Sequence, residues 1–480
     1  MDKTKRNIVI ALMVAMFLGA IEGTVVTTAV PTIVKDLNGF GLISWIFSSY
    51  LLTSAISTPV YGKLADLYGR KRTLCIGIII FLVGSCLCGL SQNMYQLVAS
   101  RILQGLGAGS IFTVTYTIVG DIFTLAERAK VQGWLSAVWG IASIIGPFVG
   151  GFFIDYLSWH WIFFINVPFG ILSIFLLQRY FNESLEKKKQ NIDYAGMFML
   201  SAAIIILLVG VPAGGKRTAV SIALTLAVLV IFYFIEKKAA EPIVPFEIIT
   251  KSNTVVNTIS LLAAAVLIGA DVYLPIYIQN VLGFRAIISG LSMAPMSVSW
   301  LISSVIIAKA LPKYGERVVI GFSIFVLFLS CLLLLPLGMG SSLITVIICT
   351  FIMGFGFGGC FPTLTIVIQA SIDHNKRGAA TALNSLVRSI GQTIGVAIFG
   401  GILNQNIVEY FNNLGIKGID PNDLYSTANI STVSLQDIQL SISSSLHIVF
   451  LAFICITVVC LALSFLLPSE LKGKDENEIL

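Results

Sequence analysis

Four ionisable side chains stand inside long apolar stretches of the sequence. Glu22 lies in the first apolar run and Asp271 in a later one, and two further runs contain Arg101 and Arg388. A charge in hydrocarbon requires a partner, a proton or a water-filled cavity. Desolvation disfavours the charged form of a carboxyl group, which lets it exchange a proton near neutral pH. Glu22 is therefore a candidate proton carrier.

The helix expected around Glu22 has small residues on one face. Ala15, Gly19, Gly23 and Thr27 recur at every fourth position, a pattern that lets another helix approach closely. We therefore expect this helix to lie inside a bundle, with its acid facing protein or a cavity.

The two arginines are expected to have different surroundings. Counting about 1.5 Å per residue places Arg101 about 8 Å and Glu22 about 12 Å from the outer surface, so the two can interact directly or through water. The alternative is that Arg101 extends to the outer headgroups. Arg388 lies about 15 Å from either surface, and it needs a carboxylate, backbone carbonyls or a water-filled cavity.

The composition indicates an integral membrane protein of the all-α class. Of the 480 residues, 56% are hydrophobic and 11% are charged, against about 25% charged residues in soluble domains, and the mean hydropathy is +0.93. The eight cysteines fall in apolar runs and the three histidines are scattered, a distribution that indicates neither disulfides nor a metal site. We expect no metal and no cofactor.

Fourteen apolar runs are long enough to cross about 30 Å of hydrocarbon. They cover residues 8–30, 42–62, 73–91, 96–119, 131–153, 162–180, 194–212, 219–236, 254–277, 288–309, 318–336, 343–367, 379–404 and 444–467. The first run follows a basic N-terminus and is long enough to span, so it is interpreted as a retained helix rather than a signal peptide.

The basic residues predict the orientation. An even number of spans places both termini on one side, and loops on that side contain most of the 30 Lys and Arg residues. The opposite loops contain Lys35, Lys216, Arg217, Arg285 and Lys417. By the positive-inside rule, both termini are expected in the cytoplasm. The net charge of +6 then reflects orientation, and no nucleic-acid partner is indicated.

An internal repeat predicts the domain organisation. Residues 105–151 align without a gap with residues 354–400, and the same offset carries Glu22 onto Asp271. We expect two parallel six-helix repeats that bind substrate where they meet, near the middle of the membrane. The expected units are a first bundle at 1–180, a linker with two inserted transmembrane helices at 181–253, and a second bundle at 254–480. The second bundle includes a long outer loop at 405–443, which is a passive tether or a cap, and a short cytoplasmic tail.

Two glycine-containing segments are candidates for conformational change. The loop after the second span contains Gly62, Asp66, Gly69, Arg70 and Lys71. Topology alone explains its basic residues but not an acid between two glycines, which can meet a helix N-terminus or a cation. The fifth span contains Gly140, Gly146, Pro147, Gly150 and Gly151. Proline kinks a helix and glycine permits close contact, although an ordinary packing helix is the alternative.

Four segments together resemble the major facilitator superfamily and, within it, the 14-span drug:proton antiporter family of the QacA/EmrB type. They are GKLADLYGRKR at 62–72, Arg101–Gly105, Gly140–Gly151 and Trp159–Gly170. The resemblance covers nearly the whole chain. It implies a major facilitator fold and export of drugs against proton entry. It also implies that the 62–72 loop latches the cytoplasmic ends of the two halves, and that the glycine-proline segment is an antiporter signature.

The resemblance gives the intramembrane charges candidate roles. The family usually has Asp at the position of Glu22 and Arg at that of His160. Proton-coupling candidates are Glu22, Asp271 and Arg101. Substrate-binding candidates are Glu22, Asp271 and Arg388, with four aromatic residues that either stack on cations or serve as ordinary packing, Tyr50, Tyr273, Trp300 and Phe361.

The leading hypothesis is a monomeric, non-enzymatic, proton-coupled antiporter in the cytoplasmic membrane that exports amphipathic, often cationic drugs. Its partners are small molecules, protons and the lipid bilayer. The alternative is an exporter of one endogenous solute such as a lipid, peptide or siderophore. A membrane receptor or assembly factor is a third class, and the intramembrane charges and the repeat argue against it.

Overall fold

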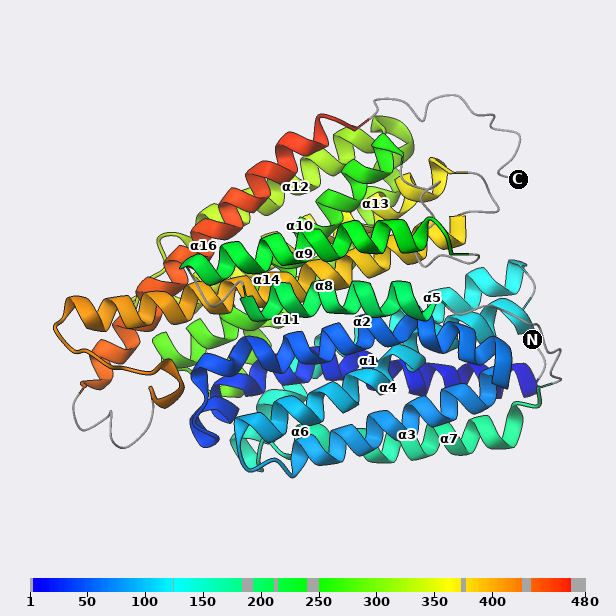
Figure 1. The fold of residues 1–480 in the computed structure, drawn as a ribbon, viewed down its shortest axis with the longest axis horizontal. Helices are drawn as coiled ribbons and strands as arrows, with labels where there is room; N and C mark the ends of the chain where they lie inside the picture. Colours follow the sequence, from blue (N-terminus) through cyan, green and yellow to red (C-terminus); the bar gives the residue numbers. More distant parts are fainter. Residues whose placement is uncertain are drawn as a thin grey trace.

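The computed structural model describes residues 3–123, 125–183, 193–210, 215–239, 250–372, 377–424 and 433–467. Within these ranges the chain is helical and contains no strand (Figure 1). The middle of the predicted outer loop, at 425–432, and the predicted tail after residue 467 lie outside the described residues.

The first part of the chain forms α1 (Lys3–Asp36), η1 (Phe40–Leu42), α2 (Ile43–Tyr68), α3 (Arg70–Gly89), α4 (Met94–Ile122), α5 (Leu125–Tyr156), α6 (Trp161–Phe164) and α7 (Asn166–Tyr180). Two further helices follow, α8 (Tyr194–Gly210) and α9 (Gly215–Glu236). The last part forms α10 (Lys251–Ile276), the π-helical turn η4 (Tyr277–Val281), α11 (Ala286–Tyr314), α12 (Glu316–Leu334), α13 (Leu343–Ala370), α14 (Arg377–Asn413), η6 (Pro421–Asp423) and α16 (Leu435–Ser464).

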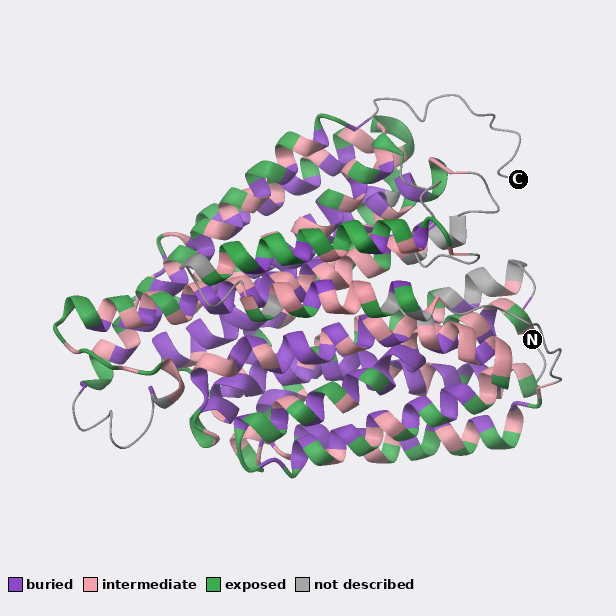
Figure 2. Cartoon of the chain, in the orientation of Figure 1, coloured by how far each residue is buried: buried purple, intermediate pink, exposed green. Residues whose placement is uncertain are grey.

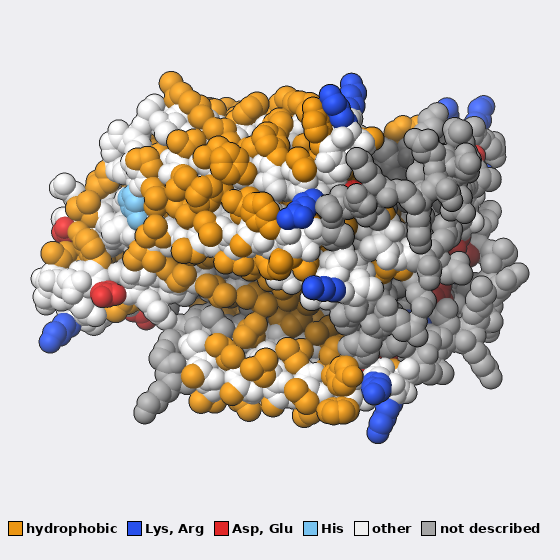
Figure 3. Space-filling model, turned by 90° about the horizontal axis from the view of Figure 1, so that it is seen from above, with side chains coloured by type: hydrophobic (Ala, Val, Ile, Leu, Met, Phe, Trp, Pro, Cys, Tyr) orange, Lys and Arg blue, Asp and Glu red, His pale blue; other side chains and the backbone are white. Residues whose placement is uncertain are grey.

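The apolar composition of these helices makes the chain a multi-pass membrane protein. Thirteen helical segments in the described ranges are long and apolar enough to cross a membrane. Helix α8 is shorter, with an apolar stretch at Phe198–Leu207, so the arrangement is compatible with the fourteen predicted spans. Hydrophobic side chains cover the middle of the face seen in Figure 3, as expected of a surface that contacts lipid.

The helices pack as two groups. Helices α1 to α7 pack on one another, and α10 to α14 pack with α16; in Figure 1 the first group runs from blue to blue-green and the second from green through yellow and orange to red. The groups meet where α5 packs on α11, α2 on α14 and α1 on α10. Buried residues are concentrated in the helices at the centre, such as α1 (Figure 2). We call the end at which α1 begins the proximal end, and the opposite end, with the last turn of α14, the distal end.

Two helices of the sequence repeat occupy equivalent places. A methyl group at Gly105 of α4 would lie 2.5 Å from the carbonyl oxygen of Tyr50 on α2, and one at Gly354 of α13 would lie 2.0 Å from the carbonyl oxygen of Met296 on α11. Each glycine therefore allows its helix to press against the neighbouring helix of its own group.

The two groups touch most closely toward the distal end. A methyl group at Gly151 of α5 would lie 2.4 Å from Cα of Ile287 on α11, and the amide of Asn404 donates a 2.8 Å hydrogen bond to the carbonyl of Gly41. The amide of Gln279 also donates to the Thr28 carbonyl, at 2.9 Å. These contacts hold the groups together at the end away from the start of α1.

Helix α8 lies against the seam between the two groups. Leu52 of α2, Ile204 of α8 and Ala397 of α14 form one buried apolar cluster. The helix pair α8–α9 therefore contacts both groups through α8. Helix α9 lies farther out, and only 17% of the residues in its most apolar stretch are buried.

Candidate functional site

Glu22 and Arg101 form an ion pair in the interior of the first helix group. Both side chains are only 1% exposed, and the Arg101 guanidinium donates to Oε1 of Glu22. The interaction predicted from their depths is confirmed, and the alternative in which Arg101 extends to the headgroups is wrong for this conformation. Of the small residues of α1, Gly19 packs closely as expected, because a methyl group there would lie 2.5 Å from the ring of Phe112 on α4, whereas one at Gly23 would meet no described atom within 4 Å.

A network of neutral polar groups surrounds this pair, and sequence reasoning missed it. The Asn166 amide at the start of α7 donates to Oε2 of Glu22 at 2.7 Å and to Oγ of Ser85 at 2.9 Å. The Gln104 side chain accepts from Arg101 at 2.7 Å and donates to Ser85 at 3.1 Å. A signal was available, since Asn166 and Gln104 are amide side chains inside predicted spans, where an unpaired polar group is costly.

Further groups on α2 hold the guanidinium of Arg101. Its Nε donates to the carbonyl oxygen of Ile46 at 3.0 Å, and its centre lies 4.2 Å from the ring centroid of Tyr50. Four helices, α1, α2, α4 and α7, thus contribute to one buried site. Tyr50 is the aromatic substrate candidate that the structure brings to Glu22, and its hydroxyl has no hydrogen-bond partner in the described part of the chain.

Asp271 lies apart from this network. It is partly exposed on the mostly buried helix α10, and within the described ranges it forms no ion pair or hydrogen bond. Tyr273, two residues later, is fully buried, and its hydroxyl donates to the carbonyl of Val396 at 2.9 Å. In this conformation Tyr273 therefore packs inside the second group, and its side chain does not lie next to that of Asp271.

Three of the substrate-binding candidates meet in the second group. The rings of Trp300 and Phe361 stack with centroids 5.6 Å apart, and the Arg388 guanidinium lies 4.1 Å from the Phe361 centroid. Phe357, which was not among the predicted candidates, stacks on Phe361 and lies tilted against Trp300, with ring centroids 5.7 Å and 5.9 Å apart. Within the described residues, Arg388 is thus held by an aromatic face and not by the carboxylate that was one of its predicted options.

Residues 62–72, predicted as a loop, are almost entirely helical: α2 continues to Tyr68 and α3 begins at Arg70, so only Gly69 lies between the helices. Charges of the first group hold this connection. Gly69 adopts φ of +96°, which suits glycine, and joins α2 to α3. Arg70 pairs with Asp66 at 3.1 Å and also with Asp121 at the end of α4. The predicted meeting of Asp66 with a cation is therefore present. Gly62 lies only near the Thr113 side chain, at 3.7 Å from an added methyl group.

The N-terminus of α3 is capped by an acid from another part of the chain. Glu183, after α7, accepts from the backbone N–H groups of Arg70 at 2.7 Å and Lys71 at 3.0 Å. Lys71 itself donates to the Gln178 carbonyl at 3.1 Å. Glu183 follows an apolar run and belongs to no motif, so the sequence alone does not single it out.

The glycine-proline segment of α5 lies where three helices meet. Added methyl groups at Gly146 and Gly150 would come within 2.0 Å and 2.3 Å of threonine hydroxyls on α1. On another side, one at Gly290 of α11 would lie 2.1 Å from the carbonyl oxygen of Pro147. Gly140 contributes a looser contact, 3.5 Å from Leu301 of α11. The segment therefore packs the first group internally and also forms the interface between the two groups.

Comparisons with known proteins agree with these features. A family model described as Major Facilitator Superfamily matches residues 12–396. Multidrug resistance protein 3 of Bacillus subtilis is 34% identical over 98% of this chain and 96% of that protein, and multidrug transporter protein MdtP of the same organism is 34% identical over 99% and 96%. In structure, the chain resembles a bacterial homolog of the human lysosomal transporter Spinster in an inward-facing, unoccupied conformation, with a TM-score of 0.72, 15% identity and 97% of each chain covered.

Proposed function

Because the chain belongs to the major facilitator superfamily, we propose that it is a proton-coupled antiporter that exports amphipathic, often cationic drugs across the cell membrane, with both termini in the cytoplasm. Relatives that match nearly its whole length are named as multidrug transporters, which supports drugs as cargo. Its activity is transport and not enzymatic catalysis.

The observation that carries the proton-coupling proposal is the buried pair of Glu22 and Arg101. If a proton neutralises Glu22, the buried guanidinium loses its counter-charge, and breaking a buried pair in this way costs about 3–5 kcal/mol. The Ile46 carbonyl and the Gln104 amide remain near Arg101, but neither carries a charge. Proton uptake is therefore unfavourable unless Arg101, or the helices that carry the pair, change position.

Such a change can reach the interface between the helix groups. Helix α1, which carries Glu22, packs through Thr24 against Gly146 of α5, and the Thr24 hydroxyl donates to the Ala142 carbonyl at 3.1 Å. Helix α5 in turn crosses α11 at Pro147. A displacement of α1 thus acts on a helix that touches both groups at close range, and this links proton exchange to alternating access.

The cargo is proposed to enter from the proximal side. The closest contacts between the groups lie toward the distal end, so with cytoplasmic termini the less closely packed proximal end faces the cytoplasm. Asp271, partly exposed and without an ion pair in the described ranges, offers negative charge to a cationic cargo. The Trp300–Phe361 stack offers aromatic faces in the second group.

Everted membrane vesicles test the proposal. Vesicles from a pump-deficient host that expresses this chain should accumulate a fluorescent cationic dye when their lumen is acidified, and a protonophore should abolish the accumulation. Vesicles without the chain serve as the control. Accumulation that persists with a protonophore, or no accumulation of any amphipathic cation, would contradict the proposal.

A further inference from the structure

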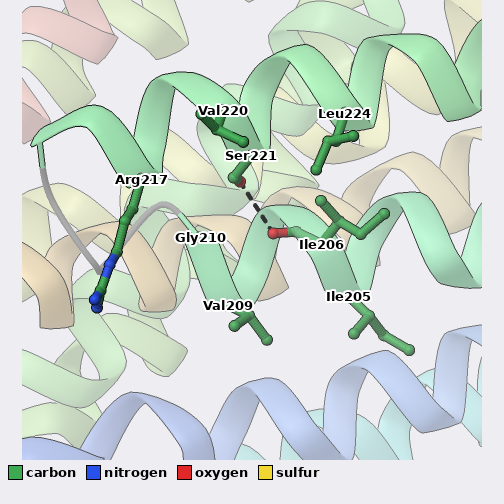
Figure 4. Close-up of a pocket in the computed structure, with 8 residues that line it drawn as sticks. All are labelled: Ile205, Ile206, Val209, Gly210, Arg217, Val220, Ser221 and Leu224. Atoms are coloured by element: carbon green, nitrogen blue, oxygen red, sulfur yellow. Dashed lines mark hydrogen bonds between the residues drawn. The ribbon is translucent and has the colours of Figure 1, made fainter.

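The inserted helix pair carries an apolar groove with a single cation at one end. The groove encloses about 530 Å³ between α8 and α9 (Figure 4). Ile205, Ile206 and Val209 line it from α8, and Val220 and Leu224 line it from α9. Arg217, in the first turn of α9, is the charged residue of the lining.

Helices α8 and α9 cross closely at Gly210 and Ser221, and the apolar groove beside this crossing is uncovered in the described part of the chain. A methyl group at Gly210 would lie 2.0 Å from Cβ of Ser221, and the Ser221 hydroxyl donates to the Ile206 carbonyl at 3.0 Å. Because the Ser221 hydroxyl is hydrogen-bonded to the backbone of α8, the side chains left to line the groove are mostly apolar. Val209 is 56% exposed and Leu224 is 51% exposed, so no described part of the chain covers the groove.

Arg217 lies at the membrane surface end of the groove and not in its middle. It stands at the beginning of α9, at the distal end (Figure 1), and the apolar lining continues from it to Leu224, about 10 Å deeper at about 1.5 Å per residue. Arg217 is exposed, and within the described residues it takes part in no ion pair. The site therefore combines a cation at headgroup depth with an apolar channel at acyl-chain depth.

We propose that the α8–α9 groove binds an anionic phospholipid of the distal leaflet, with its phosphate on Arg217 and an acyl chain between the helices. A guanidinium matches the geometry of phosphate oxygens, and juxtamembrane arginines are attracted to anionic lipids. The lining contains no acid, so charge complementarity favours an anion and opposes a cationic drug. The distal leaflet is the outer one in the orientation proposed above.

Native mass spectrometry of the full-length protein tests this site. The probes are dioleoyl phosphatidylglycerol, which is anionic, and dioleoyl phosphatidylcholine, which has the same chains and no net charge. The wild-type protein should retain the anionic lipid about fivefold more strongly, as expected for one arginine near the surface. Arg217→Gln should remove this preference, and Arg217→Lys should keep part of it. Val209→Trp, which fills the groove, should weaken retention of both lipids.

Arg285→Gln is the matched control, because Arg285 is an exposed arginine just before α11, outside the groove. It should leave the preference unchanged. Equal retention of the two lipids by the wild-type protein, or an equal loss in Arg217→Gln and Arg285→Gln, would overturn the proposal. If the wild-type protein formed dimers and Val209→Trp abolished them, the groove would instead bind a second copy of the chain. If Arg217→Gln strengthened the binding of tetraphenylphosphonium, the groove would instead bind cationic cargo. Because the readout is lipid binding, it does not depend on whether the chain exports drugs.

Discussion

The amide of Asn166 donates a 2.7 Å hydrogen bond to the Glu22 carboxylate, on the oxygen that Arg101 does not hold. Since the two residues belong to α7 and α1, this bond ties the first and last helices of the first group at a buried point. It also means that the carboxylate is held from two directions, by a cation and by a neutral donor.

The bond between Asn166 and Glu22 should be measurable as a coupling energy. Asn166→Ala removes a donor to a charged acceptor, a change that costs about 1.5–3 kcal/mol. In a Glu22→Gln background the cost should be smaller, because the acceptor is neutral. A double-mutant cycle on stability in detergent checks this. Strictly additive effects of the two substitutions would show that the bond contributes nothing.

Gly151→Ala should impair closure of the distal end. The added methyl group would lie 2.4 Å from Cα of Ile287, so α5 and α11 must separate. We expect transport to fall at least about tenfold, since a shift of the two-state balance by about 1.4 kcal/mol is sufficient for that. The measurement is cysteine accessibility at the distal end together with dye efflux.

Gly133→Ala is the matched control for that substitution. It adds the same methyl group to the same helix, but none of the atoms that the structure describes lies within 4 Å of it. Its transport should stay near the wild-type level. If both alanine variants lost transport equally, helix propensity and not the α5–α11 contact would be responsible.

Asp66→Asn should change gating more than binding. Arg70, the partner of Asp66, also forms an ion pair with Asp121. Because that second pair remains in the variant, the first group should stay folded. We propose, from the family resemblance, that residues 62–72 latch the cytoplasmic ends of the two halves when they close, in which case the loss of one charge should weaken that state. Cysteine accessibility from the two sides of the membrane measures the balance. An unchanged balance with normal transport would limit the loop to a topological role.

Asp271→Asn should weaken export of dications more than that of monocations and leave neutral substrates nearly unaffected, because attraction scales with charge. Partial exposure and the lack of an ion pair in the described ranges leave its carboxylate open to cargo. Efflux of a matched series of three substrates is the measurement. Equal losses for all three would instead assign Asp271 to proton coupling.

The contact of Glu22 with Arg101 could be predicted from the sequence, because charges in apolar runs are rare and their depths follow from helical rise. The neutral partners could not be selected in the same way. Asn166 and Gln104 stand out as amides inside predicted spans, but none of these residues is charged, so the sequence does not state which of many polar side chains joins the Glu22–Arg101 pair. Their identity depends on how four helices rotate against each other.

The substrate candidates show a related limit. Asp271 and Tyr273 were selected together, but positions two apart on a helix point about 200° from each other. Tyr273 accordingly packs inward on Val396. Trp300 and Phe361 come from α11 and α13, and their stacking depends on the close helix contact at the glycines of α13. The sequence shows that these residues are aromatic, but the packing of the helices decides which of the rings contact one another.

Proton coupling in this transporter is proposed to depend on Glu22, which carries the proton that drives export. The most direct test is Glu22→Gln in proteoliposomes, with the pH gradient and dye transport recorded together, because the substitution keeps the shape and removes the titratable group. We predict that the variant folds and binds dye, but that its uphill transport and its dye-dependent proton flux are both abolished. Uphill, proton-coupled efflux at the wild-type rate in Glu22→Gln would contradict the account.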